Sequence, residues 1–288
     1  MNEILLCPNP GRDKDLELTR EVYHLLLQNG HHPMVCPLFA RYGGYCELPE
    51  EIQVCSLETE LPRAKMVLVF GGDGTILYTA RIAAKAGVPV LGINMGNKGF
   101  IAELERTDIE LVLKAVSGNY TLESRMMLDV EAFRDGKTVF SDFALNDVVV
   151  GGIARVIDLQ VCGDGKKITA FAGDGIVVAT PTGSTAYSMA AGGPIVEPAA
   201  ENIIITPICA HALIERSFVL APDRRVSVEV GYLGKKSAYL SVDGEDSMDL
   251  LGGDILQIRK SRHVTQLVKV SERSFYEKVS EKLGERRT

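Results

Sequence analysis

The hydrophobic pattern of this chain changes once along its length, and that change restricts the folds it can adopt. Up to about residue 121, short β-rich runs alternate with segments of helical period, as where the apolar run at 65–70 precedes a helical pattern at 75–87. Such alternation predicts a parallel sheet that is covered on both faces. From residue 122 the runs are short, rich in β-branched residues and separated by hairpin-type turns such as RDGK at 134–137. The sequence therefore predicts an α/β domain followed by a mostly β domain.

Domain boundaries follow from the same change. We predict an α/β domain at residues 1–121 and a mostly β domain at 122–270. Residues 271–288 revert to helical spacing, and we expect their apolar face to pack back on the first domain. With 288 residues and 46% hydrophobic content, the chain is long enough to bury the cores of two domains.

Charge and cysteine content argue against several classes of protein. The net charge is −7 and no long basic run is present, which argues against nucleic acid as a partner. The six cysteines form no C-x-x-C pair and no zinc-type spacing with the histidines, which favours reduced structural thiols. No segment has the pattern of a signal peptide or a membrane span. We therefore expect a cytoplasmic protein without a membrane partner.

The sequence FGGDGT at 70–75 places glycines around one carboxylate at the end of an apolar run. In open α/β sheets ligands bind at the carboxyl ends of strands, and glycines let the backbone approach a phosphate closely. Neither the P-loop pattern nor G-x-G-x-x-G after a strand is present. Asp73 suits an attacking alcohol, because a carboxylate can orient a hydroxyl and accept its proton. The alternative is an ordinary turn in which Asp73 caps a helix that begins near Thr75.

A second segment, GDGIVVATPTGSTAYSMAAGGPIVEP at 173–198, is crowded with Gly, Thr, Ser and Pro between two apolar runs. It supplies several hydroxyls and the carboxylate of Asp174. STAYSMAAGG can begin a short helix whose N-terminal amides face a ligand. An irregular loop with Ser and Thr caps is the alternative.

Taken together, GGDGT at 71–75, LND at 145–147 and the segment at 173–196 resemble the NAD kinase family. Their order and separation, with LGIN and GF between 91 and 100, match that family across most of the chain. GGDGT alone is shared with lipid kinases and phosphofructokinase-like enzymes, whereas TPTGSTAY is far more specific. The resemblance implies a Rossmann-like α/β domain, a β-sandwich-like second domain, and assembly into homodimers or homotetramers.

The reaction that the resemblance implies is transfer of the terminal phosphate of ATP, or of polyphosphate, to the 2′-hydroxyl of the adenosine ribose of NAD, which gives NADP. Mg²⁺ or another divalent cation would assist this transfer. Asp73 matches the proton-accepting carboxylate of the family. Gly71, Gly72, Gly74 and Thr75 match the surrounding binding turn.

Other positions match residues that contact the dinucleotide in the family. Phe100 matches a ring near the nucleoside, with an ordinary core aromatic as the alternative. Asn146 and Asp147 match a pair that binds ribose hydroxyls, where many members have Asn-Glu; a strand-edge turn is the alternative. The remaining matches are Asp174, Thr182, Thr185, Ala186, Tyr187, Ser188, Met189 and Ala190 along the pocket wall, and Arg155, Cys209 and Glu245 near the ligand.

One position departs from the family pattern. Many bacterial members carry an arginine two residues before the aspartate of the D-G-I segment, and this chain has Ala172 there. The choice between NAD and NADH therefore stays open. Two other functions also stay open: a lipid or sugar kinase that shares only GGDGT, and a non-catalytic dinucleotide sensor built on the kinase scaffold.

Overall fold

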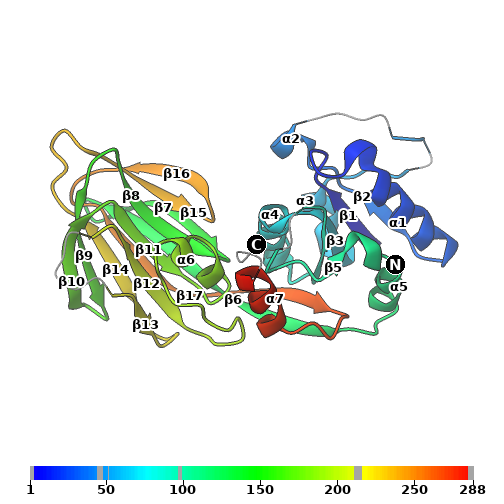
Figure 1. The fold of residues 1–288 in the computed structure, drawn as a ribbon. Helices are drawn as coiled ribbons and strands as arrows, with labels where there is room; N and C mark the ends of the chain where they lie inside the picture. Colours follow the sequence, from blue (N-terminus) through cyan, green and yellow to red (C-terminus); the bar gives the residue numbers. More distant parts are fainter. Residues whose placement is uncertain (1–2, 44–47, 51, 97–98, 211–215, 285–288) are drawn as a thin grey trace. The chain divides into compact units, whose positions relative to one another are not determined.

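The computed structural model describes residues 3–43, 48–50, 52–96, 99–210 and 216–284, and it contains two compact units. Unit 1 comprises Met1–Ser124 and Thr265–Thr288, and unit 2 comprises Arg125–Val264 (Figure 1). The chain passes between them in strands β6 (Thr121–Arg134) and β17 (Ile255–Lys269). Unit 1 is α/β and unit 2 is mostly β, which confirms the predicted fold class.

Unit 1 is built on a parallel sheet whose strands run in the order β2-β1-β3-β4. These strands are β1 (Glu3–Pro8), β2 (Pro33–Val35), β3 (Ala64–Gly71) and β4 (Val90–Asn94). Two further parallel partners lie along β4, namely β5 (Leu104–Glu105) and the end of β17. The strands are nearly continuous apolar runs because both faces of the sheet are covered.

Helices cover the two faces of this sheet. Val22 of α1 (Glu17–Gln28) and Val112 of α5 (Leu111–Val116) are buried in one core with alternate residues of β1, β3 and β4. On the other face lies α4 (Asp73–Ala86), where a Cβ at Gly92 of β4 would come within 2.6 Å of Ile76. The other described helical elements are short: α2 (Phe39–Tyr42), α3 (Leu57–Glu60) and α7 (Phe275–Gly284), with 3-10 turns at Lys14–Leu16, Leu61–Arg63 and Arg106–Asp108.

One predicted helix start in unit 1 is wrong. The spacing of Thr107 and Glu110 predicts a capping box for a helix over 107–118. The structure instead has a 3-10 turn there, and α5 begins after it. The capping box is formed by Glu105 and Asp108, whose carboxylate accepts the N–H of Glu105 at 3.0 Å. The capping box therefore begins at Glu105, two residues before the predicted Thr107.

Unit 2 is a sandwich of two sheets around one apolar core. One sheet contains β10-β9-β14 with β17, β6 and β7, and the other runs β13-β12-β11-β8-β15-β16. Alternate residues of both sheets meet in the core, such as Val130 of β6, Val228 of β14 and Val150 of β8. The strands are β7 (Lys137–Ala144), β8 (Asp147–Ile153), β9 (Ile157–Gly163), β10 (Lys166–Gly173), β11 (Gly175–Ala179), β12 (Ile203–Ile208), β13 (Phe218–Leu220), β14 (Val226–Val230), β15 (Ser237–Val242) and β16 (Glu245–Leu250).

The middle strands of the second sheet are buried on both faces, which explains their runs of valine. Val150 belongs to the shared core, whereas Val149 belongs to a second apolar cluster on the opposite face. Ala191 and Val196 pack against this second cluster. The segment rich in glycine and hydroxyl groups, residues 180–198, therefore covers the outer face of the sheet.

Backbone geometry confirms the three hairpins that the Asp-Gly turns RDGK, GDGK and VDGED predict. In the turn between β9 and β10, Asp164 and Gly165 have φ of 49° and 75°. In the turn between β6 and β7, Asp135 and Gly136 both have positive φ, at 50° and 72°. Asp243 and Gly244, in the turn between β15 and β16, also both have positive φ, at 53° and 80°. Two consecutive left-handed residues are the mark of a type I′ turn, which Asp-Gly favours.

Two predictions, on membrane spans and on cysteines, can be compared with the described residues. Over these ranges, no helix is long and apolar enough to cross a membrane. The described cysteines Cys7, Cys36, Cys55, Cys162 and Cys209 form no disulfide with one another. The Sγ atoms of Cys36 and Cys55 lie 3.0 Å apart.

Candidate active site

The GGDGT motif begins at the end of strand β3 and therefore lies at the carboxyl ends of the parallel strands of unit 1. The strand ends at Gly71, Gly72 is the N-cap residue, and α4 begins at Asp73. Gly71 has no room for a side chain, because a Cβ there would lie 2.6 Å from the Cβ of Thr75. The Thr75 hydroxyl accepts a hydrogen bond of 2.8 Å from Nδ2 of Asn9, just beyond β1. These contacts fix the glycine turn against the sheet.

The Asp73 carboxylate binds a neighbouring loop of unit 1. Its Oδ2 accepts the N–H of Phe100 at 2.7 Å, and its Oδ1 accepts that of Ile101 at 3.2 Å. Gly99 permits this approach, since a Cβ at that position would overlap the carboxylate. Because Gly72 holds the N-cap position, the alternative in which Asp73 caps α4 is wrong. A carboxylate has about four lone-pair sites, so two bound amides leave acceptor capacity for a substrate hydroxyl.

In unit 2, Asp243 organises the loop that carries the LND motif. Its carboxylate accepts the backbone N–H groups of Leu145, Asn146 and Asp147 at 2.8, 2.7 and 3.0 Å. Thr180 ties the same loop to the end of β11, because its hydroxyl donates to the Leu145 carbonyl at 2.6 Å. Its N–H donates to the carbonyl of Asn146 at 2.8 Å. The β15–β16 hairpin and the TPTGSTAY segment thus meet at one loop.

These segments line a cavity of about 420 Å³ within unit 2. Asn146, one of its lining residues, has a buried Oδ1 with no hydrogen-bond partner among the described residues. A buried acceptor without a partner is costly, so it suits a ligand that donates a hydrogen bond. The cavity is lined by Asn146, Asp147, Val149, Ala186, Tyr187, Tyr239, Ser241, Asp243 and Gly244.

Asp147 is the strongly perturbed acid of this cavity. Its side chain is buried, and this burial, followed by the charge of nearby Asp243, raises its pKa from 3.8 to about 7. Asp243 itself is held by three backbone amides, which stabilise its ionised form. The cavity therefore holds two carboxyl groups close together, and the one of Asp147 has a pKa near neutral pH.

The raised pKa of Asp147 predicts a pH-dependent stability. Between about pH 4 and pH 7 the unfolded chain has released this proton, whereas the folded chain still holds it. The free energy of unfolding should therefore fall as the pH rises, by about 1.4 kcal/mol per pH unit from this group, and level off above pH 7. In Asp147→Asn this contribution should be absent.

Urea unfolding at several values between about pH 5 and pH 8 measures the effect as the difference between wild type and variant, so that other titrating groups cancel. Asp223→Asn is the matched control, because that carboxylate is 71% exposed and lies outside the cavity lining. Its pH profile should follow the wild type. A wild-type profile for Asp147→Asn would contradict the assignment.

Several hydroxyls of residues 180–188 bond within unit 2 and hold the segment in shape. The Ser184 hydroxyl donates to a carbonyl of its own segment at 2.7 Å. The Ser188 hydroxyl is fully buried and shares a hydrogen bond of 3.1 Å with a threonine of β12. Thr182 is also buried and accepts from an arginine of β6 at 3.3 Å. Tyr187, by contrast, is 43% exposed and lines the cavity.

The structure gathers the predicted site residues into one group in each unit. In unit 1 the glycine turn and Asp73 lie beside Phe100, which is half-buried. In unit 2 four predicted residues line the cavity: Asn146, Asp147, Ala186 and Tyr187. Thr185, Ser188, Met189 and Ala190 belong to the same segment, around the predicted short helix α6 (Tyr187–Ala190). Outside the cavity lining are the exposed Arg155, Asp174 and Cys209 and the half-buried Glu245.

Sequence reasoning missed five residues of the cavity lining: Val149, Tyr239, Ser241, Asp243 and Gly244. Tyr239, Ser241 and Asp243 follow one another at every second position along β15 and its turn, so they lie on one face of the sheet. The available signal was this alternation of polar-tipped side chains on a strand. The pattern VDGED at 242–246 predicts the hairpin turn. It does not indicate that the Asp243 carboxylate accepts backbone N–H groups from another loop.

Comparison with known families agrees with this geometry. Residues 4–120 match the ATP-NAD kinase N-terminal domain, and residues 145–270 match the ATP-NAD kinase C-terminal domain. An NAD kinase of Ruminiclostridium cellulolyticum is 36% identical over 294 residues, covering 100% of this chain and 99% of that protein. An NAD kinase of Natranaerobius thermophilus is 37% identical over 290 residues, covering 98% of each chain.

Among solved structures, yeast NADH kinase complexed with NADH superposes with a TM-score of 0.86 at 24% identity. That comparison covers 100% of this chain and 89% of the yeast chain, and it shows a shared fold. The two relatives cover 98–100% of this chain, and the two domain matches lie one after the other within it. The chain therefore belongs to the NAD kinase family, the transferases that phosphorylate NAD.

Proposed function

We propose that this chain transfers the terminal phosphate of ATP to the 2′-hydroxyl of the adenosine ribose of NAD, with Asp73 as the proton acceptor. The observation that carries this assignment is the Asp73 carboxylate, which two backbone amides hold at a glycine turn on the carboxyl edge of a parallel sheet. In a loose phosphoryl-transfer transition state, alignment of the attacking alcohol matters more than the strength of the base. The Asp73 carboxylate can supply that alignment because the two backbone amides hold it in place.

The unit 2 cavity is proposed to bind the dinucleotide. Asn146 Oδ1 is an acceptor without a described partner, and the ionised form of Asp147 is a second acceptor, so both suit ribose hydroxyls. Tyr187 and Tyr239 offer aromatic surface to a nucleoside. The further proposed binding residues are Gly71, Gly72, Gly74, Thr75, Phe100, Arg155, Asp174, Thr182, Thr185, Ala186, Ser188, Met189, Ala190, Cys209 and Glu245.

A divalent cation fits this reaction as a companion of ATP. Among the described residues, no three His, Cys, Asp or Glu side chains gather as a metal centre. Mg²⁺ is commonly held by one or two carboxylates together with substrate phosphates, and Asp73 is a carboxylate at the phosphate-binding turn. When bound, the ion neutralises charge on the phosphates, while the protein aligns the hydroxyl.

Three wider proposals concern the domain bounds, the assembly and the location of the protein. We propose that the catalytic half comprises residues 1–121 with 271–288, and that the dinucleotide half comprises 122–270. Assembly as a homodimer or homotetramer is a proposal that light scattering of the purified protein can test. A cytoplasmic location is proposed from the cysteine content of the sequence.

Formation of NADP tests the proposed reaction. Purified protein with NAD, ATP and a magnesium salt should give NADP, measured with a coupled NADP-specific dehydrogenase. Polyphosphate in place of ATP, and NADH in place of NAD, define the donor and the redox form. No NADP above a blank without protein, with either donor, would overturn the proposal. Release of ADP with a diacylglycerol or hexose phosphate, but not with NAD, would identify a lipid or sugar kinase instead.

A further inference from the structure

We propose that the C-terminal helix α7 positions the Asp73 carboxylate for phosphoryl transfer, through Lys278 and Lys282. The proposal rests on the proposed role of Asp73 and adds residues that the reaction does not itself require. Its basis is the loop at 99–103 of unit 1, because this loop binds Asp73 on one side and the C-terminal segment on the other.

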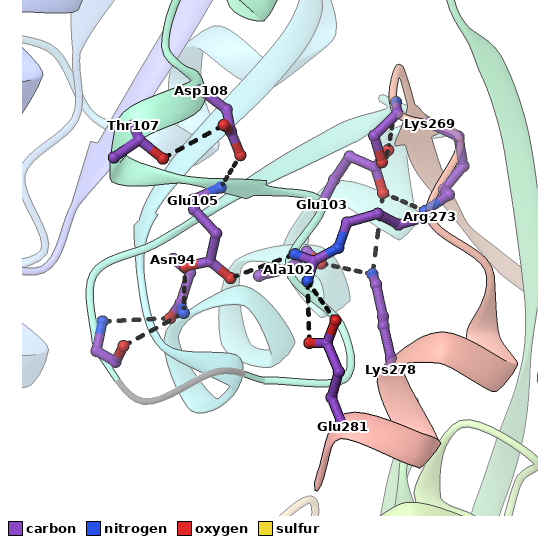
Figure 2. A network of polar contacts seen from close by, with 12 residues as sticks. Asn94, Ala102, Glu103, Glu105, Thr107, Asp108, Lys269, Arg273, Lys278 and Glu281 are labelled. Carbon is purple, nitrogen blue, oxygen red and sulfur yellow. Dashed lines mark hydrogen bonds and ion pairs between the residues drawn. The ribbon is translucent and has the colours of Figure 1, made fainter.

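Three residues of this loop contact the C-terminal segment, and Figure 2 shows the contacts of two of them, Ala102 and Glu103. Nζ of Lys278 donates to the carbonyl of Ala102 at 2.7 Å. Nζ of Lys282 lies 4.2 Å from the centre of the Phe100 ring, a cation–π contact. The Glu103 side chain, only 3% exposed, pairs with Lys269 and lies 3.9 Å from Nζ of Lys278. The C-terminal segment thus contacts the loop at Phe100, Ala102 and Glu103.

Glu103 is the anchor of this arrangement. Its Oε1 accepts the N–H groups of Val270 and Ser271 at 3.0 and 2.8 Å, and the Ser271 hydroxyl at 2.7 Å. Its own N–H donates to the carbonyl of Gly92 on β4 at 3.0 Å. A buried carboxylate with this many donors is strongly localised, because losing a partner leaves an uncompensated charge. One end of the loop is therefore fixed to the sheet and to the C-terminal segment.

The route from α7 to the catalytic carboxylate is short. Phe100 and Ile101 donate their N–H groups to Asp73, and Ala102, the next residue, accepts from Lys278. Lys278 therefore holds the backbone immediately after the two donors, and a shift of the loop at Ala102 can reach the Ile101 and Phe100 amides along the chain. A misplacement of about 1 Å in a reacting group can cost up to about 100-fold in rate. Lys278 and Lys282 are thus placed to act on the reaction through Asp73.

Helix α7 has stabilising contacts that do not involve these lysines. Ser274 and Glu277 form a reciprocal pair at its start, with the Ser274 N–H donating to Glu277 at 2.7 Å. Arg273 binds Glu281 through two hydrogen bonds of 2.9 and 3.0 Å. Substitution of Lys278 or Lys282 by methionine, a good helix former of similar length, should therefore leave the helix in place.

A double-mutant cycle tests the proposal. Lys278→Met and Lys282→Met are each made in the wild type and in Asp73→Asn, and kcat and KM for NAD are measured in all proteins. In the wild type each substitution should lower kcat about 3- to 10-fold with KM within about twofold. In the Asp73→Asn background the same substitutions should change kcat by less than about twofold, because the group they position has been removed. Lys278→Arg, which keeps a donor, should recover part of the rate.

The outcomes separate this inference from the proposed function. An equal loss of kcat in both backgrounds, or no loss in the wild type, would overturn the positioning role. Full activity of Asp73→Asn would instead overturn the role of Asp73. If Lys278→Met does not fold, Lys282→Met decides, since it does not disturb the Glu103 ion pair. Arg106→Gln, which removes an exposed ion pair to Glu17 in the same unit, is the control and should leave kcat unchanged.

Discussion

Asparagine in place of Asp73 should reduce kcat on the order of 10²- to 10⁴-fold while the affinity for NAD stays close to that of the wild type. The amide keeps the size of the side chain but cannot accept the proton of the attacking hydroxyl. Binding should persist, because the proposed dinucleotide contacts of Asn146 and Asp147 come from unit 2. The measurement is steady-state NADP formation together with calorimetric titration of NAD.

The geometry of Asp73 determines the controls for this experiment. Both carboxylate oxygens accept backbone N–H groups, so an amide NH₂ would face one donor and could disturb the loop. The apparent melting temperature of the variant is therefore compared with the wild type. Asp108→Asn is a matched control, since Asp108 also accepts a backbone N–H in unit 1 but lies away from the glycine turn. It should keep its kcat. A fully active Asp73→Asn would rule out the carboxylate as the proton acceptor.

Local patterns of the sequence were sufficient for much of the fold. The alternation of strands and helices identifies the α/β unit, because a parallel sheet buried on both faces requires uninterrupted apolar strands such as 65–70. Asp-Gly turns located three hairpins correctly, since few other residues adopt two consecutive positive φ angles. The predicted helix start near Thr107 was wrong because Glu105 with Asp108 and Thr107 with Glu110 have the same capping-box spacing, and spacing alone cannot rank the two pairs.

Contacts between distant segments could not be inferred from local patterns. Asp243 binds the amides of Leu145 to Asp147 across about 100 residues of chain, and nothing in the turn sequence specifies that partner. The same holds for Asp73, whose partners Phe100 and Ile101 lie beyond β4. Burial also decides which hydroxyls form hydrogen bonds within the protein and which face the cavity. The composition of a run of Thr and Ser does not distinguish these two cases. The motifs therefore identify the site residues, whereas tertiary contacts define how they are held.

Alanine in place of Gly183 is expected to destabilise unit 2 by about 2–4 kcal/mol and to weaken NAD binding at least about tenfold. A Cβ at this position would overlap the carbonyl oxygen of Asn146 and lie 2.6 Å from its carbonyl carbon. Both are backbone atoms, so no rotation of a side chain can relieve the overlap. The turn at 180–185 would have to move away from the LND loop and lose the two hydrogen bonds of Thr180 to that loop.

The Gly183→Ala substitution acts on two motifs that are far apart in the sequence, TPTGSTAY and LND. The apparent melting temperature and the calorimetric dissociation constant for NAD should both change, since Asn146 Oδ1 moves with its backbone. Gly74→Ala is the control for stability: its Cβ would meet no atom within 4 Å, and alanine favours a helix there, so its melting temperature should not fall. Wild-type stability and affinity in Gly183→Ala would mean that the turn and the LND loop do not act as one unit in binding the dinucleotide.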